Sequence, residues 1–447
     1  MDFLDLMLLP IYLGVFYYLA YRTVGKNQKN PLYKQYYIRG LNYKFFGSIA
    51  FAFIYLYYYK GGDTISFYWA TAPLYKLFFT DPLWFFKFVS GLDTRYPGVC
   101  GMEAAQHGVI YMLRGSATLT TIRIASLINI FCLNSFTVLA ISFAYISYLF
   151  IWRLFILFAS IYPKLSKEFA IAFLMIPSAI FWGSGLSKDT IMNGSIMALV
   201  YCFYKLFILK KVTFRHVFMF LVAAYIIALI RGFILFTVLP CLMLMTVVYY
   251  RNSINNSFLR FVVGPVFILI GVGASYLLIH SLGDSVQSYK LDSLAQKAEG
   301  FRSWHTYLGK TEGGSSYTIG GDIEYTPTGI LKQAPVAIVT TLFGPFVWQI
   351  RNFVMLLSGV ESLAFLYFTI QLLFNRKIYR LLNVLFSDPI VVFCLSFIFV
   401  LSIAIGLTSF NYGALVRYKI PILPFFATAI ILIKYHLNEN KVVRQWS

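Results

Sequence analysis

The stretch YYYKGGDTISFYW, residues 57–69, marks a change in the character of the sequence. An apolar segment ends in aromatic residues and Lys60, two glycines follow, and a single carboxylate, Asp63, comes directly after them. A segment of about 20 apolar residues is long enough to cross a bilayer as a helix. The stretch therefore predicts the end of a membrane-spanning helix, with a lone acid at the membrane surface.

The composition of the whole chain also indicates a membrane protein. The 447 residues are 59% hydrophobic and 12% charged, with a mean hydropathy of +0.72, whereas a soluble domain carries about 25% charged residues. The five cysteines show no CxxC or Cys/His spacing, which argues against a disulfide framework and a structural metal site. We therefore expect a single all-α membrane domain over residues 1–447.

Length and hydropathy predict about eleven membrane-spanning helices. Asp2 and Asp5 precede the first apolar segment where a signal peptide has basic residues, so we expect a retained helix. The segment 336–374 is too long for one span and contains a Pro and an Arg, so we expect it to be broken. The predicted spans are 6–21, 45–59, 124–150, 169–184, 190–209, 216–230, 233–250, 261–281, 336–374, 389–409 and 418–435.

The basic residues predict an orientation. The net charge is +20, and most of the excess lies in one set of loops, which includes the region from Arg22 to Lys44 and the loop from Lys210 to Arg215. Loops rich in Lys and Arg tend to stay in the cytoplasm. We therefore expect the N-terminus outside and the C-terminus in the cytoplasm. The charge then reflects topology, and no nucleic-acid partner is expected.

Two larger loops are then expected on the outer side. Loop A, 60–123, contains APLYKLFFTDPLWFFKFVSG at 72–91, where aromatic residues alternate with Lys and Asp. This mixture is typical of amphipathic helices that lie in the membrane interface. Loop B, 282–335, is polar, acidic and rich in glycine. Neither loop is long enough for a separate enzyme domain, so we expect any chemistry to be built from loops and helix ends.

Asp63 is the first candidate for chemistry. It stands at the outer end of the second predicted span, and the two preceding glycines let a substrate approach the backbone closely. A carboxylate in a partly desolvated site is a suitable general base for a hydroxyl acceptor. The alternative is that Asp63 only caps a helix.

The second candidate is PSAIFWGSGLSKDTIMNG, 177–194. We expect one helix to end at the glycines and the next to start near Lys188, with Ser187 or Asp189 as its cap. The free N–H groups and the positive dipole of a helix start favour anions, and Lys188 adds a positive charge. This pattern predicts a phosphate or pyrophosphate site; the alternative is a polar turn with a local Lys–Asp pair.

Further cations interrupt the apolar segments. Arg231 lies in ALIRGFILF, and Arg417 and Lys419 lie in FNYGALVRYKIPILP at 410–424. Charges beside spanning segments usually face a cavity or a partner, and Arg holds phosphate through two parallel hydrogen bonds. We predict contacts to a lipid phosphate; the alternative is that these side chains extend to the lipid headgroups.

Other polar residues are weaker candidates. Asp189, His107 and Tyr412 are additional candidates for the site, His107 as an acid or base in loop A and Tyr412 beside Arg417. Arg351 and Glu361, in the broken ninth segment, are instead expected to form an ion pair between helices.

Taken together, these pieces resemble the GT-C superfamily of multi-spanning glycosyltransferases. In that superfamily a helix leads to a first large external loop that begins with a catalytic acid and carries surface-lying helices. GGDTISFY and the 72–91 region match this pattern, and PSAIFWGSGLSKDT, FGPFVWQIRN and YGALVRYKIPILP resemble stretches of poorly characterised bacterial members. The chain differs in having an extra first helix and no DxD or DE pair, which leaves a divalent metal open; no other cofactor is indicated.

The resemblance implies transfer of a sugar or glycan from a polyprenyl-(pyro)phosphate-linked donor to a hydroxyl of a glycan, lipid or protein. The reaction would take place at the outer face of a bacterial inner (cytoplasmic) membrane. Asp63 would act as the base, and Lys188, Arg231, Arg417 and Lys419 would contact the lipid phosphate.

Two other functions stay open. A flippase or other transporter for lipid-linked oligosaccharides needs polar residues near the bilayer midplane and broken helices in paired positions. The predicted spans hold few charges away from their ends, which argues against it. A non-catalytic subunit of an envelope assembly complex is the third interpretation, and the residues do not exclude it.

Overall fold

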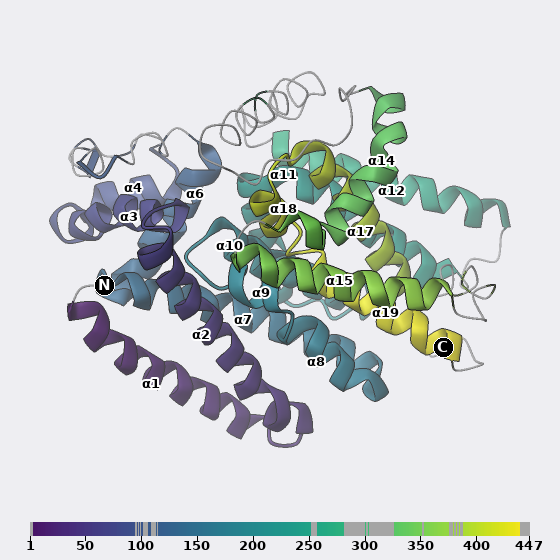
Figure 1. Cartoon of the computed structure of the whole chain (residues 1–447), viewed down its shortest axis with the longest axis horizontal. Coiled ribbons are helices and arrows are strands. Elements are labelled where there is room, and N and C mark those ends of the chain that lie inside the picture. The colour runs from purple at the N-terminus through teal and green to yellow at the C-terminus, as the bar shows by residue number, and fades with distance from the viewer. Residues whose placement is uncertain are drawn as a thin grey trace. The chain divides into compact units, whose positions relative to one another are not determined.

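The computed structural model shows an all-helical protein in the part of the chain that it describes. It describes residues 3–438 except 94–95, 97, 99, 102–105, 109–112, 114, 252–256, 281–299, 301–302, 304–325, 351–352, 375–378, 380, 382–383 and 385–387. Within these ranges helices are joined by turns, and no β-strand is present (Figure 1). The predicted all-α class is confirmed.

Several of these helices have the length and hydropathy of membrane spans. Among the described residues, six helices are long and apolar enough to cross a membrane, or seven if one bent pair counts as a single span. The chain therefore has the character of a polytopic membrane protein. The predicted number of about eleven spans is not reached by this criterion.

Internal contacts divide the chain into two compact units, where the sequence predicts one membrane domain. Unit 1 comprises Met1–Met175 and Ala179–Tyr201, and unit 2 comprises Ile176–Ser178 and Cys202–Ser447. The helices α9 (Pro177–Trp182) and α10 (Lys188–Phe203) have residues in both units.

Unit 1 is built on α2, which packs against α7, while α3 packs against α4 and α6. A single-turn π-helix, η2, continues α2, so that the two form one rod of 38–58. The elements of unit 1 before α9 are α1 (Phe3–Lys26), η1 (Tyr33–Tyr37), α2 (Ile38–Phe53), η2 (Ile54–Tyr58), α3 (Asp63–Thr80), α4 (Pro82–Ser90), α6 (Ser116–Asn129), η4 (Ile130–Cys132), α7 (Phe136–Ile161), η5 (Pro163–Leu165) and α8 (Ser166–Leu174).

Unit 2 is centred on α17, which packs against α11, α14 and α19. Its inward side chains are apolar, with Phe393 and Phe397 stacked on each other and edge-on to Phe425 of α19. The elements are η6 (Tyr204–Ile208), α11 (Phe214–Tyr250), α12 (Ser257–His280), α14 (Pro327–Phe343), η10 (Val347–Gln349), α15 (Phe353–Leu373), α17 (Pro389–Thr408), α18 (Tyr412–Tyr418) and α19 (Leu423–Asn438).

The structure breaks two predicted spans that look continuous in hydropathy. The span 124–150 is divided between α6 and α7, because Leu133 and Asn134 adopt left-handed backbone angles, with φ of 52° and 56°. The span 169–184 consists of α8, nine residues long, and α9, six residues long. Hydropathy cannot detect such breaks when apolar residues such as Leu133 form the turn.

Other breaks lie where the sequence predicts them. Arg231 has non-helical angles inside α11, between the predicted spans 216–230 and 233–250. The segment 336–374 is broken after α14, where the Gly344–Pro345 bond is cis and η10 follows. The last predicted span is preceded by α18, and α18 and α19 are bent by 63° relative to each other.

Loop A forms helices, as predicted, and the stretch 72–91 is divided between α3 and α4. Asp81 ends α3 and caps α4, accepting a hydrogen bond of 3.0 Å from the backbone N–H of Trp84. Phe88 of α4 is buried, whereas Leu83 and Phe86 are exposed. Exposed apolar side chains on a surface helix fit the predicted interfacial position. Loop B lies almost entirely outside the described residues.

Close helix packing in unit 1 depends on a glycine of α2. A Cβ added at Gly47 would lie 2.2 Å from the backbone oxygen of Ile180, so no larger residue fits. In α1, by contrast, a Cβ at Gly14 meets nothing within 4 Å.

We predict that Gly47→Ala lowers the free energy of unfolding by about 1–3 kcal/mol, the usual cost of overpacking a close contact. Gly14→Ala is the matched control, since it adds the same methyl group in open space and Ala favours helix. Thermal melting of the purified variants in one detergent measures the difference. Equal melting of the two variants would contradict the packing of α2 on Ile180.

Candidate functional site

Asp63 is the first residue of α3, and Gly62 occupies the cap position before it. Gly62 has φ +100°, and a Cβ there would lie 2.8 Å from Tyr55 Cε1, so this turn requires glycine. Gly62 is therefore explained by the turn that starts α3, whereas a Cβ on Gly61 would meet only Tyr59 O, at 4.0 Å. Asp63 does not act as the N-cap; it is half-buried in the first turn, where the helix dipole favours a carboxylate.

Lys188 begins α10, as predicted, and Ser187 caps the helix by accepting a hydrogen bond of 3.2 Å from Thr190 N–H. The half-buried Lys188 Nζ donates to Thr118 Oγ1 at 2.8 Å and lies 5.5 Å from the ring centroid of Phe67. Phe67 stands one helical turn after Asp63, on the same face of α3. Unit 1 thus brings the ammonium of Lys188 alongside the helix that Asp63 begins.

The remaining candidates of unit 1 are also placed. His107 is exposed and stacks on Trp69 of α3, with ring centroids 3.8 Å apart and planes at 12°. Asp189 is 2% exposed in the first turn of α10. Asp63, Lys188 and His107 are therefore all arranged around α3.

Arg231 and the motif at 410–424 lie together in unit 2. The Arg231 guanidinium carbon lies 4.3 Å from the ring centroid of Tyr418, a cation–π contact made where α11 is non-helical. Tyr418 stands between Arg417, which is half-buried, and Lys419 in the sequence. Tyr412 is buried at the start of α18, with Cε1 3.2 Å from the position of a Cβ on Gly344.

Lys419 is almost completely buried, at 1% exposure. Its Nζ donates to the Gly344 oxygen at 2.7 Å and to Ser362 Oγ at 2.8 Å, and Ser362 Oγ donates to the same oxygen at 3.0 Å. These bonds satisfy the backbone at the break after α14. A role of Lys419 in phosphate binding stays a prediction, with one N–H of the ammonium left for it.

Glu361, which precedes Ser362 in α15, links this region to the start of α9. Its Oε2 accepts a hydrogen bond of 2.7 Å from Ser178 N–H, and the hydroxyls of Ser178 and Ser358 lie 3.1 Å apart. Glu361 makes no direct ion pair with Lys419, and its Oε1 has no hydrogen-bond partner in the described part of the chain. The partner expected from the sequence, Arg351, lies outside the described residues.

The network joins three stretches that are far apart in the sequence. Ser178 belongs to PSAIF, Gly344 to FGPFVW and Lys419 to RYKIPILP, and all three lie in unit 2. These are the phrases on which the resemblance rests. Sequence inspection could name them separately, but only the fold brings them together.

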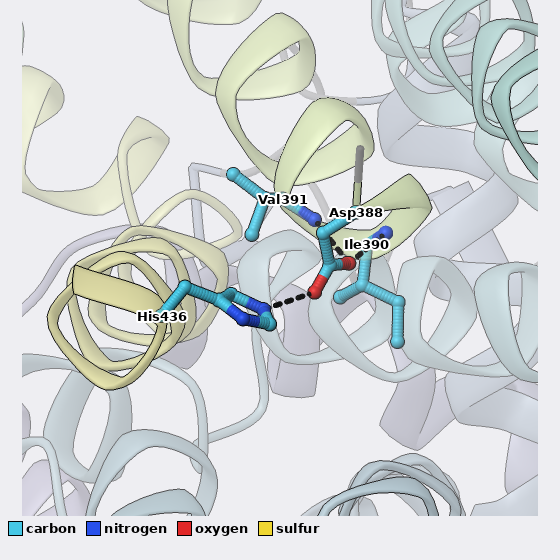
Figure 2. A network of polar contacts seen from close by, with 4 residues as sticks. All are labelled: Asp388, Ile390, Val391 and His436. Carbon is cyan, nitrogen blue, oxygen red and sulfur yellow. Dashed lines mark hydrogen bonds and ion pairs between the residues drawn. The ribbon is translucent and has the colours of Figure 1, made fainter. Parts of the chain in front are cut away.

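A second buried network, which the sequence analysis did not foresee, joins the start of α17 to the end of α19 (Figure 2). Asp388 Oδ1 accepts from Ile390 N–H and Val391 N–H, at 2.8 and 3.2 Å, while Oδ2 lies 2.7 Å from His436 Nε2. An Asp-Pro pair before an apolar run is a recognisable helix-start signal. The contact with His436 had no such signal.

Lys44 is the second unforeseen group, and its place corrects the sequence analysis. It was counted with the basic loop residues, but it lies in α2 at 5% exposure, and its Nζ donates to the Gly183 oxygen at 2.6 Å. The position just before the predicted span 45–59 favoured a loop. The structure starts the helix earlier, at Ile38, and so moves Lys44 into the packed interior.

Comparison of the chain with protein-family models, with curated proteins and with solved structures finds no match. The predicted residues are thus placed by geometry alone: Asp63, Lys188, Asp189 and His107 in unit 1, and Arg231, Tyr412, Arg417 and Lys419 in unit 2. No group of three or more metal-ligating side chains is found among the described residues.

We predict that Lys419→Met lowers the free energy of unfolding by about 3–5 kcal/mol, because it removes the buried hydrogen bonds to the Gly344 oxygen and to Ser362 and the positive charge near the buried Glu361 carboxylate. Lys434→Met, on the exposed side of α19, is the control and should melt like the wild type. Thermal melting in detergent provides the measurement. A Lys419→Met variant that is as stable as Lys434→Met would show that the buried network is not needed for folding.

For the second network, we predict that Asp388→Ala and His436→Ala each destabilise the protein by about 1–3 kcal/mol, through the lost cap and the unpaired partner. Because the two side chains interact directly, the double variant should lose less than the two single losses added together. Additive losses in this double-mutant cycle would exclude a direct coupling.

Proposed function

We propose that this protein transfers a sugar or glycan from a polyprenyl-(pyro)phosphate-linked donor to a hydroxyl acceptor at the outer face of a cytoplasmic membrane. The acceptor is a glycan, a lipid or a protein. The arrangement of Asp63 and Lys188 around α3 carries this proposal, because it offers a carboxylate and a cation from distant parts of the chain.

In the proposed reaction the acceptor oxygen attacks the anomeric carbon of the donor sugar. The bond between this carbon and the phosphate oxygen breaks, and the acceptor proton passes to the carboxylate of Asp63. Negative charge then builds on the leaving phosphate, which Lys188 stabilises at the start of α10. No nucleotide is needed, as suits chemistry outside the cytoplasm.

The residues of unit 2 have separate proposed roles. Arg231 and Arg417, with the ring of Tyr418 against Arg231, supply a cationic region that suits phosphate. Their position beside a break in α11 and at the bent pair α18–α19 supports this use, because helix interruptions expose backbone groups as well as side chains.

A second candidate function is transport of a lipid-linked oligosaccharide. The observation that favours it is the presence of buried charges near helix interruptions, Lys44 in unit 1 and Glu361 with Lys419 in unit 2. Buried ionisable groups and broken helices are frequent at the binding sites of transporters. The sequence analysis found few such charges, because it placed Lys44 in a loop.

We predict that Asp63→Asn abolishes transfer while leaving the protein level and melting temperature unchanged, since Asn is similar in size but cannot accept the proton. The measurement is complementation in the native host, with the surface glycan analysed by gel and the membrane level of the variant by blotting. Asp81→Asn is the matched control. Asp81 caps α4 and has no proposed role in the reaction, and Asn caps helices about as well, so this variant should keep transfer.

The fate of the lipid-linked donor separates the two functions. Donor that accumulates on the outer leaflet in the Asp63→Asn strain supports a transferase, whereas donor stranded on the inner leaflet supports a transporter. Normal glycan at a normal protein level would remove Asp63 as the base and would favour a subunit of an assembly complex.

A further inference from the structure

Lys44 is a buried cation without a counter-charge in the part of the chain that the structure describes. Its side chain is 5% exposed, its Nζ donates to the Gly183 oxygen at 2.6 Å, and it makes no ion pair with a described carboxylate. An ammonium group has three N–H donors. The Gly183 bond therefore uses one donor and leaves the charge uncompensated.

The position of Lys44 along α2 makes this charge costly. It stands six residues after Ile38 and 14 before Tyr58 in the rod formed by α2 and η2, or about 9 and 21 Å from its two ends. Charges buried in an apolar bundle are rare and usually face a partner or a water-filled cavity. The charge of Lys419 in unit 2 is better compensated. Lys419 also donates to Ser362 Oγ, and the carboxylate of Glu361, the residue before Ser362, influences its charge.

Polar atoms without partners surround the same place. A Cβ on Gly183 would lie 3.5 Å from Lys44 Nζ, 3.3 Å from Asn193 Nδ2 and 2.5 Å from the Ala179 oxygen. Glycine is therefore required, and Lys44 Nζ and Asn193 Nδ2 both lie close to it. Asn193 Oδ1 and Ser48 Oγ, one turn along α2 from Lys44, have no hydrogen-bond partner among the described residues, although both side chains are buried.

The backbone at this place is not helical. Residues 183–187 connect α9 to α10, and all five are buried. Non-helical backbone inside a membrane protein is tolerated where it is enclosed by protein or lines a polar cavity. Lys188 follows this segment directly. The interruption therefore has the buried Lys44 ammonium bound at its first residue, Gly183, and the half-buried Lys188 just after its last residue.

A capping role for Lys44 explains only part of this arrangement. Lysine often binds the last carbonyls of a helix, and the Gly183 oxygen directly follows α9. Such a cap needs neither the unpartnered Ser48 hydroxyl nor the Asn193 amide. An oxyanion accounts for all of these groups: Lys44, Ser48 and Asn193 Nδ2 donate to it, and Asn193 Oδ1 accepts from its proton or from a neighbouring hydroxyl.

We propose that unit 1 contains a binding site for a phosphate-type oxyanion, centred on Lys44 and completed by Asn193 and Ser48. The site is distinct from the half-buried cation Lys188 and does not depend on sugar transfer. The same chemistry is available in free phosphate and in the headgroup of a polyprenyl phosphate, and the experiment distinguishes the two sources.

The test is the melting temperature of the purified full-length protein in detergent. Inorganic phosphate is titrated at constant ionic strength with chloride, and a polyprenyl monophosphate in mixed micelles forms the second arm. The wild type should gain stability with phosphate, with the lipid or with both. Lys44→Met should gain none, and Lys44→Arg should retain the gain because the charge is kept.

The behaviour without ligand provides an independent criterion. Lys44→Met should melt at or above the wild type in phosphate-free buffer, because an apolar side chain replaces a buried, uncompensated charge. Lys419→Met should melt well below the wild type in the same buffer, because the Lys419 ammonium makes two buried hydrogen bonds and lies near the Glu361 carboxylate. Asn193→Ala leaves the bond from Lys44 to Gly183 and should weaken phosphate binding about tenfold, the effect of one hydrogen bond to a charged group.

Three results would overturn the proposal. A wild type that responds to neither phosphate source, with Lys44→Met melting below it, would leave Lys44 as a cap of α9 alone. A phosphate response that Lys44→Met retains in full would place the anion elsewhere. Should Lys44→Met fail to fold, an Asn193→Ala variant with unchanged phosphate binding would decide against the site.

Discussion

The constraint on which the rest of the structure depends is the need to satisfy polar backbone where a helix is interrupted inside an apolar bundle. Each unit meets this need with a buried lysine bound to a glycine oxygen just after a helix end, Lys44 to Gly183 after α9 and Lys419 to Gly344 after α14. The ammonium group suits this position, because it donates to carbonyls and opposes the negative end of the helix dipole. These interruptions lie next to the residues proposed for function.

The two lysines differ in their surroundings, and the difference has a physical meaning. Lys419 belongs to a network of hydroxyls with Glu361 close by, so its charge is largely compensated within unit 2. Lys44 has only the carbonyl, with unpartnered groups of Ser48 and Asn193 beside it. The two bonds of Lys419 and the nearby carboxylate stabilise the fold, whereas the single bond of Lys44 leaves donors that a ligand can use. The proposed oxyanion site follows from this contrast.

The proposed transferase chemistry uses the same principle of helix starts and ends. Asp63 and Lys188 stand at the first residues of α3 and α10, where side chains leave the packed bundle and remain half-exposed. The bonds of Lys44 and Lys419 satisfy the backbone at the interruptions, while Asp63 and Lys188 lie at half-buried positions that a substrate can approach. The buried lysines thus stabilise the apolar core, and the half-buried residues at helix starts are the ones proposed to react.

The sequence by itself determined the helical class, the membrane character and the breaks at Arg231 and after α14, because hydropathy and a charge or proline in an apolar run act locally. It also identified Lys188 as a residue at a helix start, but it placed Asp63 at the outer end of a span, whereas the structure places Asp63 at the start of α3. Only the tertiary structure decided that Lys44 is buried, that Leu133 forms a turn, that His436 meets Asp388, and that Ser178, Gly344 and Lys419 share one network. These features depend on contacts between residues far apart in the chain, which no local pattern records.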